Sequence, residues 1–594
     1  MVLAKRISMR TFVLAFLALS PLYYVSAADD QPLAAKARQV LRRHCVECHS
    51  GQDDDDGFNV LNAAAMRSSD EGYVIAQDPE ESLVYLRIID EDMPPAANRE
   101  LQPVTEEERE ILRQWIAGGA TDFPQADRSD FVSIESIYSA ALGYLRNAAR
   151  EDRPQLRFFT LHNVYNRRST DPSDLRFYRA GLSKVLNSLT WERRITLPDA
   201  VEVDGVNDDI LYVIDLKEFG WDRQRNANWN ELQKAYPYGL SFEFSQHHGE
   251  AHENDLAVQG LTQTQIPVLR ADWFVATATR PPLYHKLLQI PTDARSLEAR
   301  LEVSIASDFL NPKPRRIARA GFARSGISGQ NRLVQRSDAL HGFYWKSYDF
   351  KPDTGRAKLT RFPLGPANLF EDRRHPFERF AFEHDGGEVI FSLPNGMQAY
   401  MLVDGEDQRI DVGPITVVSD ARRTSGTPEI VNGLSCIACH RHGMIKFKDS
   451  IRLGNATFGE VEQHVERLYP EREAMDELLQ EDQQRFMQAL RRCISTYFND
   501  EDDLQSFDEP VRKVAVWHRS VYLDLNTVLT ELDLKEETQL LRVGDNTLKR
   551  LGLESLMKGG VISRPEWEAL DSKFGPSLMQ QIATELGATP VLPL

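Results

Sequence analysis

The stretch LRRHCVECHSGQ, from Leu41 to Gln52, holds a Cys-x-x-Cys pair that is followed directly by a histidine. The arrangement returns roughly four hundred residues later in GLSCIACHRHGM, at Cys436, Cys439 and His440. Four of the five cysteines in this 594-residue chain belong to these two units. The function of the chain must therefore account for a motif that occurs twice.

Cys-x-x-Cys-His is the attachment signature of c-type haem. Two thiols add across the vinyl groups of the porphyrin, and the adjacent histidine reaches the iron from one side. The sequence therefore predicts two covalently bound haems c. Their attachment and proximal residues are Cys45, Cys48 and His49 for the first, and Cys436, Cys439 and His440 for the second.

Two other interpretations of the paired cysteines remain open. A thioredoxin-like disulfide follows a strand and opens a helix, whereas Cys45 ends an amphipathic helical run, LAAKARQVLRRH. A shared zinc site is disfavoured because each unit has its own histidine and no third cysteine pair supports it. The fifth cysteine, Cys493, lies in the helical stretch RFMQALRRCISTYF, and we expect a buried thiol without a chemical role.

The segment after the first motif offers a sixth ligand. Met93 is followed by two prolines, which stiffen the loop that presents it. The other nearby methionine, Met66, lies in AAAMRSS, which we expect to be helical. Further on, TEEEREILRQWIAGGA predicts a helix with Thr105 as its N-cap, Glu108 as the capping-box partner, and glycines at its end.

Together these features resemble a class I cytochrome c domain, and DMPP and GFNVL resemble most the type found in planctomycetes. The shared features are a helix leading to the motif, a Met-Pro loop, and a last helix with Trp115 and Ile116. The resemblance covers residues 28–124 and implies a small all-helical fold with His49 and Met93 as axial ligands. Thioether ligation raises the reduction potential, and a haem with both axial positions filled is suited to one-electron transfer.

The first residues read as a secretory signal peptide. Lys5, Arg6 and Arg10 form a basic region, TFVLAFLALS is a short apolar core, and Val25–Ala27 is a small-residue cleavage site. An uncleaved anchor is the alternative, although the apolar run is short for a bilayer span and is followed by a proline. We expect removal of residues 1–27, export to the periplasm or beyond, and no integral membrane segment afterwards.

The chain is acidic, with a formal net charge of −19. The predicted leader carries only basic charges, so the mature chain is more acidic still. This argues against nucleic acid and against anionic membrane surfaces as partners. A redox protein, not identified by the sequence, is the expected partner.

Residues 125–430 predict an α+β domain. SIESIYSAALGYLRNAAREDRPQLRFFTLHNVYNRR and DLRFYRAGLSKVLNSLTW have helical spacing, DILYVIDLKEFGW is typical of a strand, and GGEVIFSLPNGMQAYMLVD predicts a hairpin that turns at PNG. Residues 431–594, opened by the second motif, predict a helical module. The expected architecture is thus multidomain: an all-α cytochrome c domain, then an α+β domain, then a helical C-terminal module.

No Met-Pro loop follows the second motif, so its sixth ligand must come from elsewhere. Met444 and His442 are too close to His440 to reach the opposite face of a haem. His384, which precedes a glycine turn and the hairpin, is our first choice, and His285 is the second. An open sixth position is the third possibility. The histidines of SQHHGEAHE are interpreted as part of a polar loop rather than a metal site.

Two functions from different classes follow. The favoured one is a diheme electron carrier. The alternative is a diheme oxidoreductase, peroxidase-like, with an open second haem, and the large extra region around that haem favours it. However, no distal acid–base group is evident, and the two motifs do not lie in two similar domains. A third possibility is a redox or gas sensor or an interaction protein, so the sequence leaves open whether the chain is an enzyme.

Overall fold

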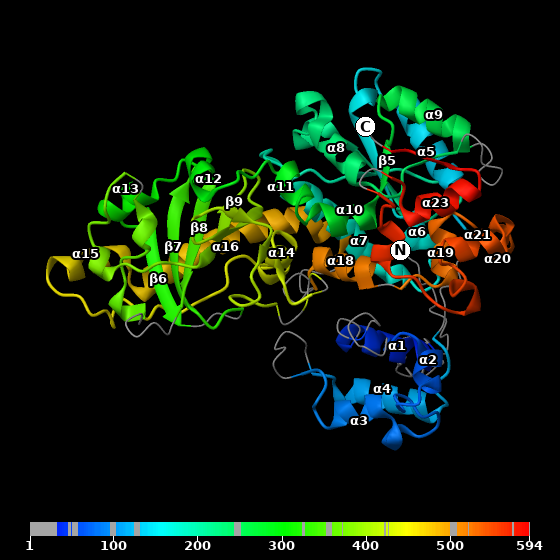
Figure 1. Ribbon diagram of the computed structural model, residues 1–594, viewed down its shortest axis with the longest axis horizontal. Coiled ribbons are helices and arrows are strands. Elements are labelled where there is room, and N and C mark those ends of the chain that lie inside the picture. The colour runs from blue at the N-terminus through cyan, green and yellow to red at the C-terminus, as the bar shows by residue number, and fades with distance from the viewer. Residues whose placement is uncertain are drawn as a thin grey trace, which may run out of the picture.

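The fold is taken from a computed structural model (Figure 1). It describes residues 32–45, 49, 58–95, 103–123, 131–242, 251–323, 327–351, 359–370, 372–420, 423, 425, 427–498, 508–520, 522–572 and 575–592. The predicted signal peptide, Cys48 and the pair His247 and His248 lie outside the described residues. We call the part between 32 and 123 the N-terminal domain and the part between 131 and 592 the body.

The described part of the N-terminal domain contains α-helices and one single-turn 3-10 helix. The α-helices are α1 (Leu33–His44), α2 (Ala63–Ser68), α3 (Leu83–Ile89) and α4 (Glu106–Ala117). The capping box predicted for the last helix is confirmed, because the Thr105 side chain accepts from the backbone N–H of Glu108 and the Glu108 carboxylate accepts from that of Thr105.

Helices α1 and α4 pack against each other through a small apolar core. Leu41, Trp115 and Ile116 are each no more than 2% exposed. At the end of α1, His44 Nε2 lies 3.1 Å from Glu108 Oε2 on α4, so one carboxylate caps its own helix and also fixes the neighbouring one. The predicted helices of the N-terminal domain are thus present and joined by both apolar and polar contacts.

The body contains a four-stranded sheet in the order β2-β3-β1-β5. Its strands are β1 (Leu156–Thr160), β2 (Asp199–Ala200), β3 (Leu211–Asp215) and β5 (Val268–Arg270). The strand predicted in DILYVIDLKEFGW is confirmed as β3. The helical interpretation of LRFFT was wrong, because this segment is β1, buried along its whole length between antiparallel β3 and parallel β5.

A second sheet has six antiparallel strands in the order β11-β10-β9-β8-β7-β6. Its strands are β6 (Ile317–Ala323), β7 (Asn331–Ala339), β8 (Gly342–Phe350), β9 (Gly386–Ser392), β10 (Gln398–Asp404) and β11 (Arg409–Ile410). The predicted hairpin at PNG is confirmed, because β9 and β10 pair in register on either side of that turn. Figure 1 shows this sheet at one end of the body and the smaller sheet at the other.

Two short strand pairs complete the sheets. The β12 strand (Val412–Gly413) pairs with β13 (Ile430–Val431), and β14 (Thr589–Pro590) pairs with β4 (Leu240–Ser241). The second pair joins segments that lie some 350 residues apart in the chain, more than the length of a typical domain.

Helices cover both sheets. They are α5 (Ile134–Asn147), α6 (His162–Asn166), α7 (Leu175–Ser188), α8 (Arg223–Ala235), α9 (Ala251–Thr262), α10 (Ala271–Ala278), α11 (Leu283–Leu287), α12 (Ala294–Arg300), α13 (Ile305–Leu310), α14 (Leu434–Cys439), α15 (Glu460–Leu468), α16 (Arg472–Ile494), α18 (Pro510–Ser520), α19 (Leu525–Glu531), α20 (Glu537–Leu540), α21 (Asp545–Arg550), α22 (Arg564–Glu568) and α23 (Leu578–Glu585). No described helix combines the length and hydropathy needed to cross a bilayer.

The structure shows no break in packing near residue 430, where the sequence predicted a domain boundary. One continuous apolar core runs from Val132 to Ala588. Helix α18 packs on α7 and α10, and Asp482 of α16 bonds Arg336 on β7. The helices after residue 430 therefore cover elements that precede residue 430 in the chain. Each amphipathic helix buries its apolar face against the apolar surface of those elements.

Candidate haem sites

The first motif begins where α1 ends. The backbone N–H of His49 donates to the Cys45 carbonyl at 2.9 Å, and the N–H of Val60 donates to the His49 carbonyl at 3.0 Å. These bonds hold Cys45 and His49 one helical turn apart. Both residues are half-buried. Their thiol and imidazole are thus anchored by the backbone at the surface of the small core.

Aromatic rings flank the histidine. The His49 ring meets Phe58 edge-on at 5.2 Å between centroids, and Phe58 stacks on Tyr73 at 4.0 Å. Phe58, Tyr73 and Cys45 each pack against the core on one side and are only partly buried. A half-covered apolar face with a sulfur and an imidazole donor fits a flat, apolar, thioether-linked macrocycle.

Met93 lies in the loop after α3, where its backbone N–H donates to the Arg87 carbonyl at 3.0 Å. It is half-buried, whereas Met66 is 1% exposed within the core. Of the two methionines in the N-terminal domain, only Met93 therefore has a thioether that the core does not already enclose.

The second motif lies on α14, inside the body. Gly433, which precedes the helix, has φ of +85°, and a Cβ there would come within 2.5 Å of the Thr279 carbonyl and 2.9 Å of Tyr284. Only glycine allows this approach. The helix then buries Cys436, which is 2% exposed, and leaves Cys439 half-buried. The described cysteines form no disulfide.

His440, at the end of α14, is held through one ring nitrogen. Its Nδ1 lies 3.2 Å from the Gly443 carbonyl, and its ring stacks on Tyr400 at 5.9 Å. A proton on Nδ1 donated to that carbonyl leaves the Nε2 lone pair for a metal, which is the arrangement common among metal-ligating histidines.

The structure places Glu388 of β9 opposite Nε2, and sequence reasoning missed it. Its Oε2 lies 3.6 Å from His440 Nε2. Burial alone raises the pKa of Glu388, but the His440 imidazole and Arg332 bring that pKa below its usual range. Burial and the nearby Glu388 raise the pKa of the Cys436 thiol. The signal in the sequence was one acidic residue within the apolar strand GGEVIFS.

The donor set of the second motif fits haem c, since it offers two thiols and an imidazole whose Nδ1 lies at a backbone carbonyl. The space in front of His440 is narrow, because Glu388 and Tyr400 both lie against its ring. A haem held by Cys436, Cys439 and His440 would therefore have Glu388 beside its iron.

His384 does not lie beside His440. Paired residues of antiparallel strands share a face, so Glu388 and Tyr400, which both contact His440, mark one face of the six-stranded sheet. His384 instead meets Tyr348 edge-on at 5.5 Å, and Tyr348 lies on the other face. The sheet thus separates His384 from His440, so His384 does not suit the role of sixth ligand at the second motif.

His285, the second choice, lies near the start of α14 but is already engaged. Its Nε2 lies 2.8 Å from Asn432 Nδ2, and its Nδ1 lies 3.3 Å from Asp411 Oδ1. Burial lowers its pKa to about 4. A neutral imidazole with both nitrogens engaged has a structural role here.

Comparisons with known proteins agree with the geometry of the first motif. No match was found among curated proteins or among solved structures. A family model described as planctomycete cytochrome C matches residues 45–97, the segment that contains the first motif, His49 and Met93. The chain therefore carries a c-type cytochrome domain, of the planctomycete kind, which implies covalently bound haem c.

Proposed function

We propose that this protein is an exported diheme c-type cytochrome that transfers electrons. The observation that carries the proposal is the cytochrome match over residues 45–97, together with the half-buried Cys45, His49 and Met93 in that segment. A haem c held there supplies a one-electron ferric/ferrous couple.

The residues of the N-terminal domain have distinct tasks in this function. His49, anchored by its backbone bonds, presents an imidazole, and Met93 presents a thioether that favours ferrous iron. Phe58 and Tyr73 exclude water from one side of the histidine ring. With both axial positions filled by protein, the site has no position for a substrate, which suits a carrier.

The second haem belongs to the proposal because Cys436, Cys439 and His440 repeat the motif, and the His440 Nδ1 lies at the Gly443 carbonyl. Glu388 replaces His384 as the group that faces the metal position. Export is supported by the leader-like residues 1–27. It also agrees with the proposed haems, since a c-type maturation machinery attaches haem outside the cytoplasm.

The test is haem content per chain with an optical spectrum, on full-length protein matured by such a machinery. Two covalent haems are expected, the one at His49 and Met93 low-spin, and a double Cys436→Ala, Cys439→Ala variant should retain that one. A single haem in the unchanged chain would contradict the second site, and none at all would contradict the whole proposal.

The oxidoreductase alternative is favoured by one observation, the Glu388 carboxylate beside Nε2. Beside the position that a haem iron would take, this buried carboxylate could serve as a general base, since its pKa lies below the usual range. In that case the second haem is high-spin, and Glu388→Gln abolishes peroxide consumption without changing the spin state. If Glu388 is instead a ligand, the haem is also high-spin, because a carboxylate is a weak-field ligand, and the same substitution shifts its absorption bands.

A further inference from the structure

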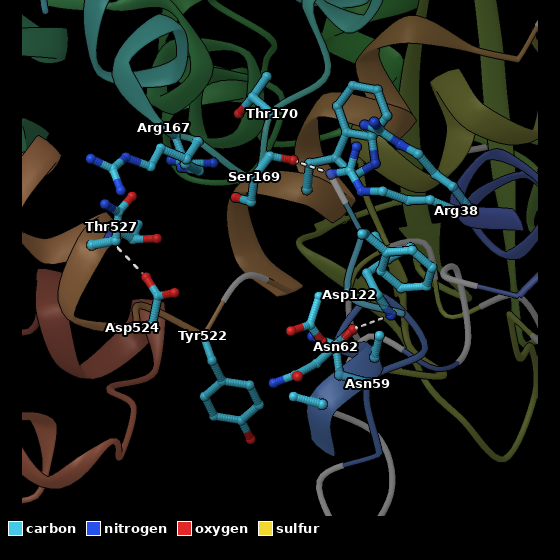
Figure 2. A pocket seen from close by; sticks show the side chains of 18 of the residues that line it. Arg38, Asn59, Asn62, Asp122, Arg167, Ser169, Thr170, Tyr522, Asp524 and Thr527 are labelled. Carbon is cyan, nitrogen blue, oxygen red and sulfur yellow. Dashed lines mark hydrogen bonds between the residues drawn. The ribbon is translucent and has the colours of Figure 1, made fainter. Parts of the chain in front are cut away.

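A cavity of about 530 Å³ lies between the N-terminal domain and the body (Figure 2). Its lining comes from α1, the start of α2 and the segment near Asp122 on one side. The loop after α6, the end of α18 and the segment from Tyr522 to Thr527 form the other side. The volume lies within the range of sites that bind small molecules.

Contacts across the cavity rim hold the two parts together. Arg38 of α1 donates to the Ser169 carbonyl of the body, and Arg42 pairs with Asp174. The guanidinium of Arg42 also lies 4.6 Å from the ring centre of Trp517 on α18. Docking of the N-terminal domain therefore builds the cavity.

The lining is rich in positive charge within an acidic chain. Its charged members are Arg38, Arg42, Arg167, Arg168, Asp122 and Asp524. Both aspartates are already engaged, since Asp122 accepts from Arg67 at 2.8 Å and Asp524 accepts from the backbone N–H of Thr527 at 2.7 Å. Arg38, Arg42 and Arg167 also have carboxylate partners, in Asp171, Asp174 and Glu531. The charge of Arg168 is not paired within the described part of the chain, and it favours an anionic occupant.

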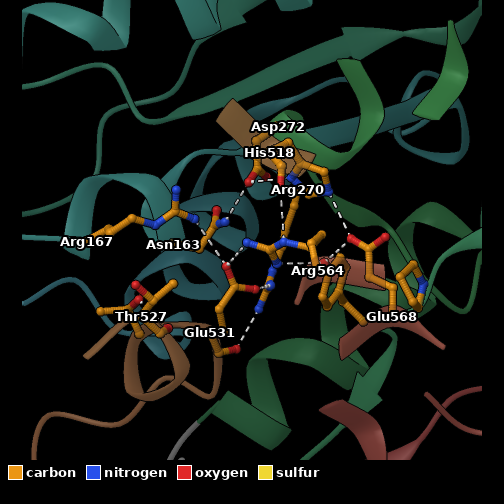
Figure 3. A network of polar contacts seen from close by, with 12 residues as sticks. Asn163, Arg167, Arg270, Asp272, His518, Thr527, Glu531, Arg564 and Glu568 are labelled. Carbon is orange, nitrogen blue, oxygen red and sulfur yellow. Dashed lines mark hydrogen bonds and ion pairs between the residues drawn. The ribbon is translucent and has the colours of Figure 1, made fainter. Parts of the chain in front are cut away.

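Arg167 connects the cavity to a buried ionic network (Figure 3). Its Nη2 lies 3.3 Å from Glu531, which also pairs with Arg270 and with Arg564 at 3.1 Å. Three guanidinium groups thus share one carboxylate. Burial raises the pKa of Glu531, but the three arginines bring it well below its usual range.

Two guanidinium groups facing the cavity still have hydrogen-bonding capacity. Arg167 is 3% exposed, and its Nε has no hydrogen-bond partner among the described residues. Arg168, next along the chain, is exposed and forms no ion pair within the described part of the chain. Arginine binds carboxylates through a planar fork of donors, so this pair suits a carboxylate.

The remaining lining suits a hydroxylated carbon skeleton. Asn59, Asn526 and Tyr522 offer amide and hydroxyl groups, and Trp517 and Phe123 offer aromatic surface. We propose that this cavity binds a small hydroxylated organic acid, with its carboxylate at Arg167 and Arg168 and its hydroxyl groups toward the amides. This role goes beyond electron transfer and does not depend on the number of haems.

The site adjoins the first haem motif. Arg42 lies one turn before Cys45 on the same helical run, and Asn59 directly precedes Val60, which bonds the His49 carbonyl. An acid bound in the cavity therefore contacts both parts of the protein, and its binding is coupled to the contact between them.

The test is titration calorimetry on the full-length holoprotein at constant ionic strength, with D-glucuronate, D-glucose and inorganic sulfate as probes. D-glucuronate should bind saturably and more tightly than the neutral sugar or sulfate. Arg168→Gln should weaken that binding by about tenfold or more, the size of a lost charge-assisted hydrogen bond. The matched control is Arg150→Gln, which removes an exposed arginine before β1 rather than after it.

Three results would overturn the proposal: no saturable binding of D-glucuronate, an equal loss in Arg168→Gln and Arg150→Gln, or binding of sulfate alone. The haem spectrum of the same sample tests the electron-transfer function separately. A sample with normal haem content that fails to bind D-glucuronate contradicts only this site.

Discussion

At the scale of single residues, the proposed ligand Met93 can be compared with Met66, a methionine of the core. Axial ligands set haem potentials over a range of about 0.8 V. Met93→Ala is therefore expected to lower the potential of the first haem by on the order of 100 mV, as measured by spectroelectrochemistry. Met66→Leu, which changes a 1% exposed methionine at nearly constant volume, is the matched control and should leave the potential in place. Equal potentials in the unchanged protein and Met93→Ala would reject the ligand.

Asp255 on α9 gives a pH-dependent prediction. It is fully buried, and burial raises its pKa to about 6. Because the folded state holds this proton more tightly than the unfolded chain, the carboxyl favours folding below about pH 4 and loses that contribution as pH rises through about 6. Between these two pH values the free energy of unfolding should fall by roughly 1.4 kcal/mol per pH unit because of this group, and Asp255→Asn should remove that slope.

The measurement is urea unfolding of both proteins across that range. The two free energies of unfolding should diverge as pH rises from about 4 to about 6, with the variant gaining relative to the unchanged chain. Parallel curves would show that Asp255 ionises normally in the folded protein.

Local motifs could be predicted residue by residue, whereas the partner of His440 could not. The Cys-x-x-Cys-His spacing and the loop of Met93 are visible in short stretches of sequence. Glu388 reaches His440 only because β9 and α14 pack together across some fifty residues of chain. His384 was chosen for its place before a turn, but the face of a sheet depends on strand register, which sequence spacing does not reveal.

At the scale of elements, α16 is fixed to the six-stranded sheet by one buried carboxylate. Asp482 is 4% exposed, pairs with Arg336 at 2.9 Å, and accepts from the Trp345 indole N–H at 2.9 Å. Asp482→Ala removes one of the two carboxylates that pair with the buried Arg336 guanidinium, the other being Asp338 at 2.7 Å, and should cost about 1–3 kcal/mol of stability.

Chemical unfolding of the full chain measures this loss. The control on the same helix is Glu477→Ala, whose carboxylate forms an exposed pair with Arg315 at 3.6 Å. It should leave the midpoint unchanged. Equal midpoints for the two variants would mean that Asp482 does not hold the helix to the sheet.

Elements were predictable where their signals are local. The α4 helix carries its own capping box, and the β9–β10 hairpin carries its own Asn-Gly turn. The strand β1 carries no such signal, since a short apolar run such as LRFFT fits a buried strand or a buried helix equally well. Pairing with β3 and β5 decides between them, and both partners lie far away in the chain.

At the scale of the whole molecule, two parts meet through Arg42. Figure 1 shows α1 facing α18, where Arg42 pairs with Asp174 and lies over Trp517. Arg42→Ala removes both contacts and should increase the radius of gyration measured by small-angle X-ray scattering.

The neighbouring Arg43→Ala is the matched control. Arg43 is mostly exposed and pairs with Glu108 within the N-terminal domain. The scattering curve of Arg43→Ala should equal that of the unchanged protein. Equal haem content in all samples excludes a folding defect. Identical curves for Arg42→Ala and Arg43→Ala would mean that Arg42 does not hold the two parts together.

The first domain was predictable as a unit because its motif, loop and last helix are contiguous. The boundary near 430 was not, because composition shifts from mixed to helical there while packing continues. Whether helices form a separate module depends on which apolar surface they cover, and that surface here comes from earlier in the chain.

The pairing of β14 with β4 has a consequence for biogenesis. This strand pair cannot form until residues near 590 have been made, since it joins them to residues near 240. Cys436 is 2% exposed in the closed body, so if the proposed second haem is attached there, a maturation enzyme has to reach this thiol earlier. On that proposal, the interval between the synthesis of Cys436 and that of β14 is a time in which a lyase can reach the second motif, whereas the first motif, outside that core, can be processed before or after it.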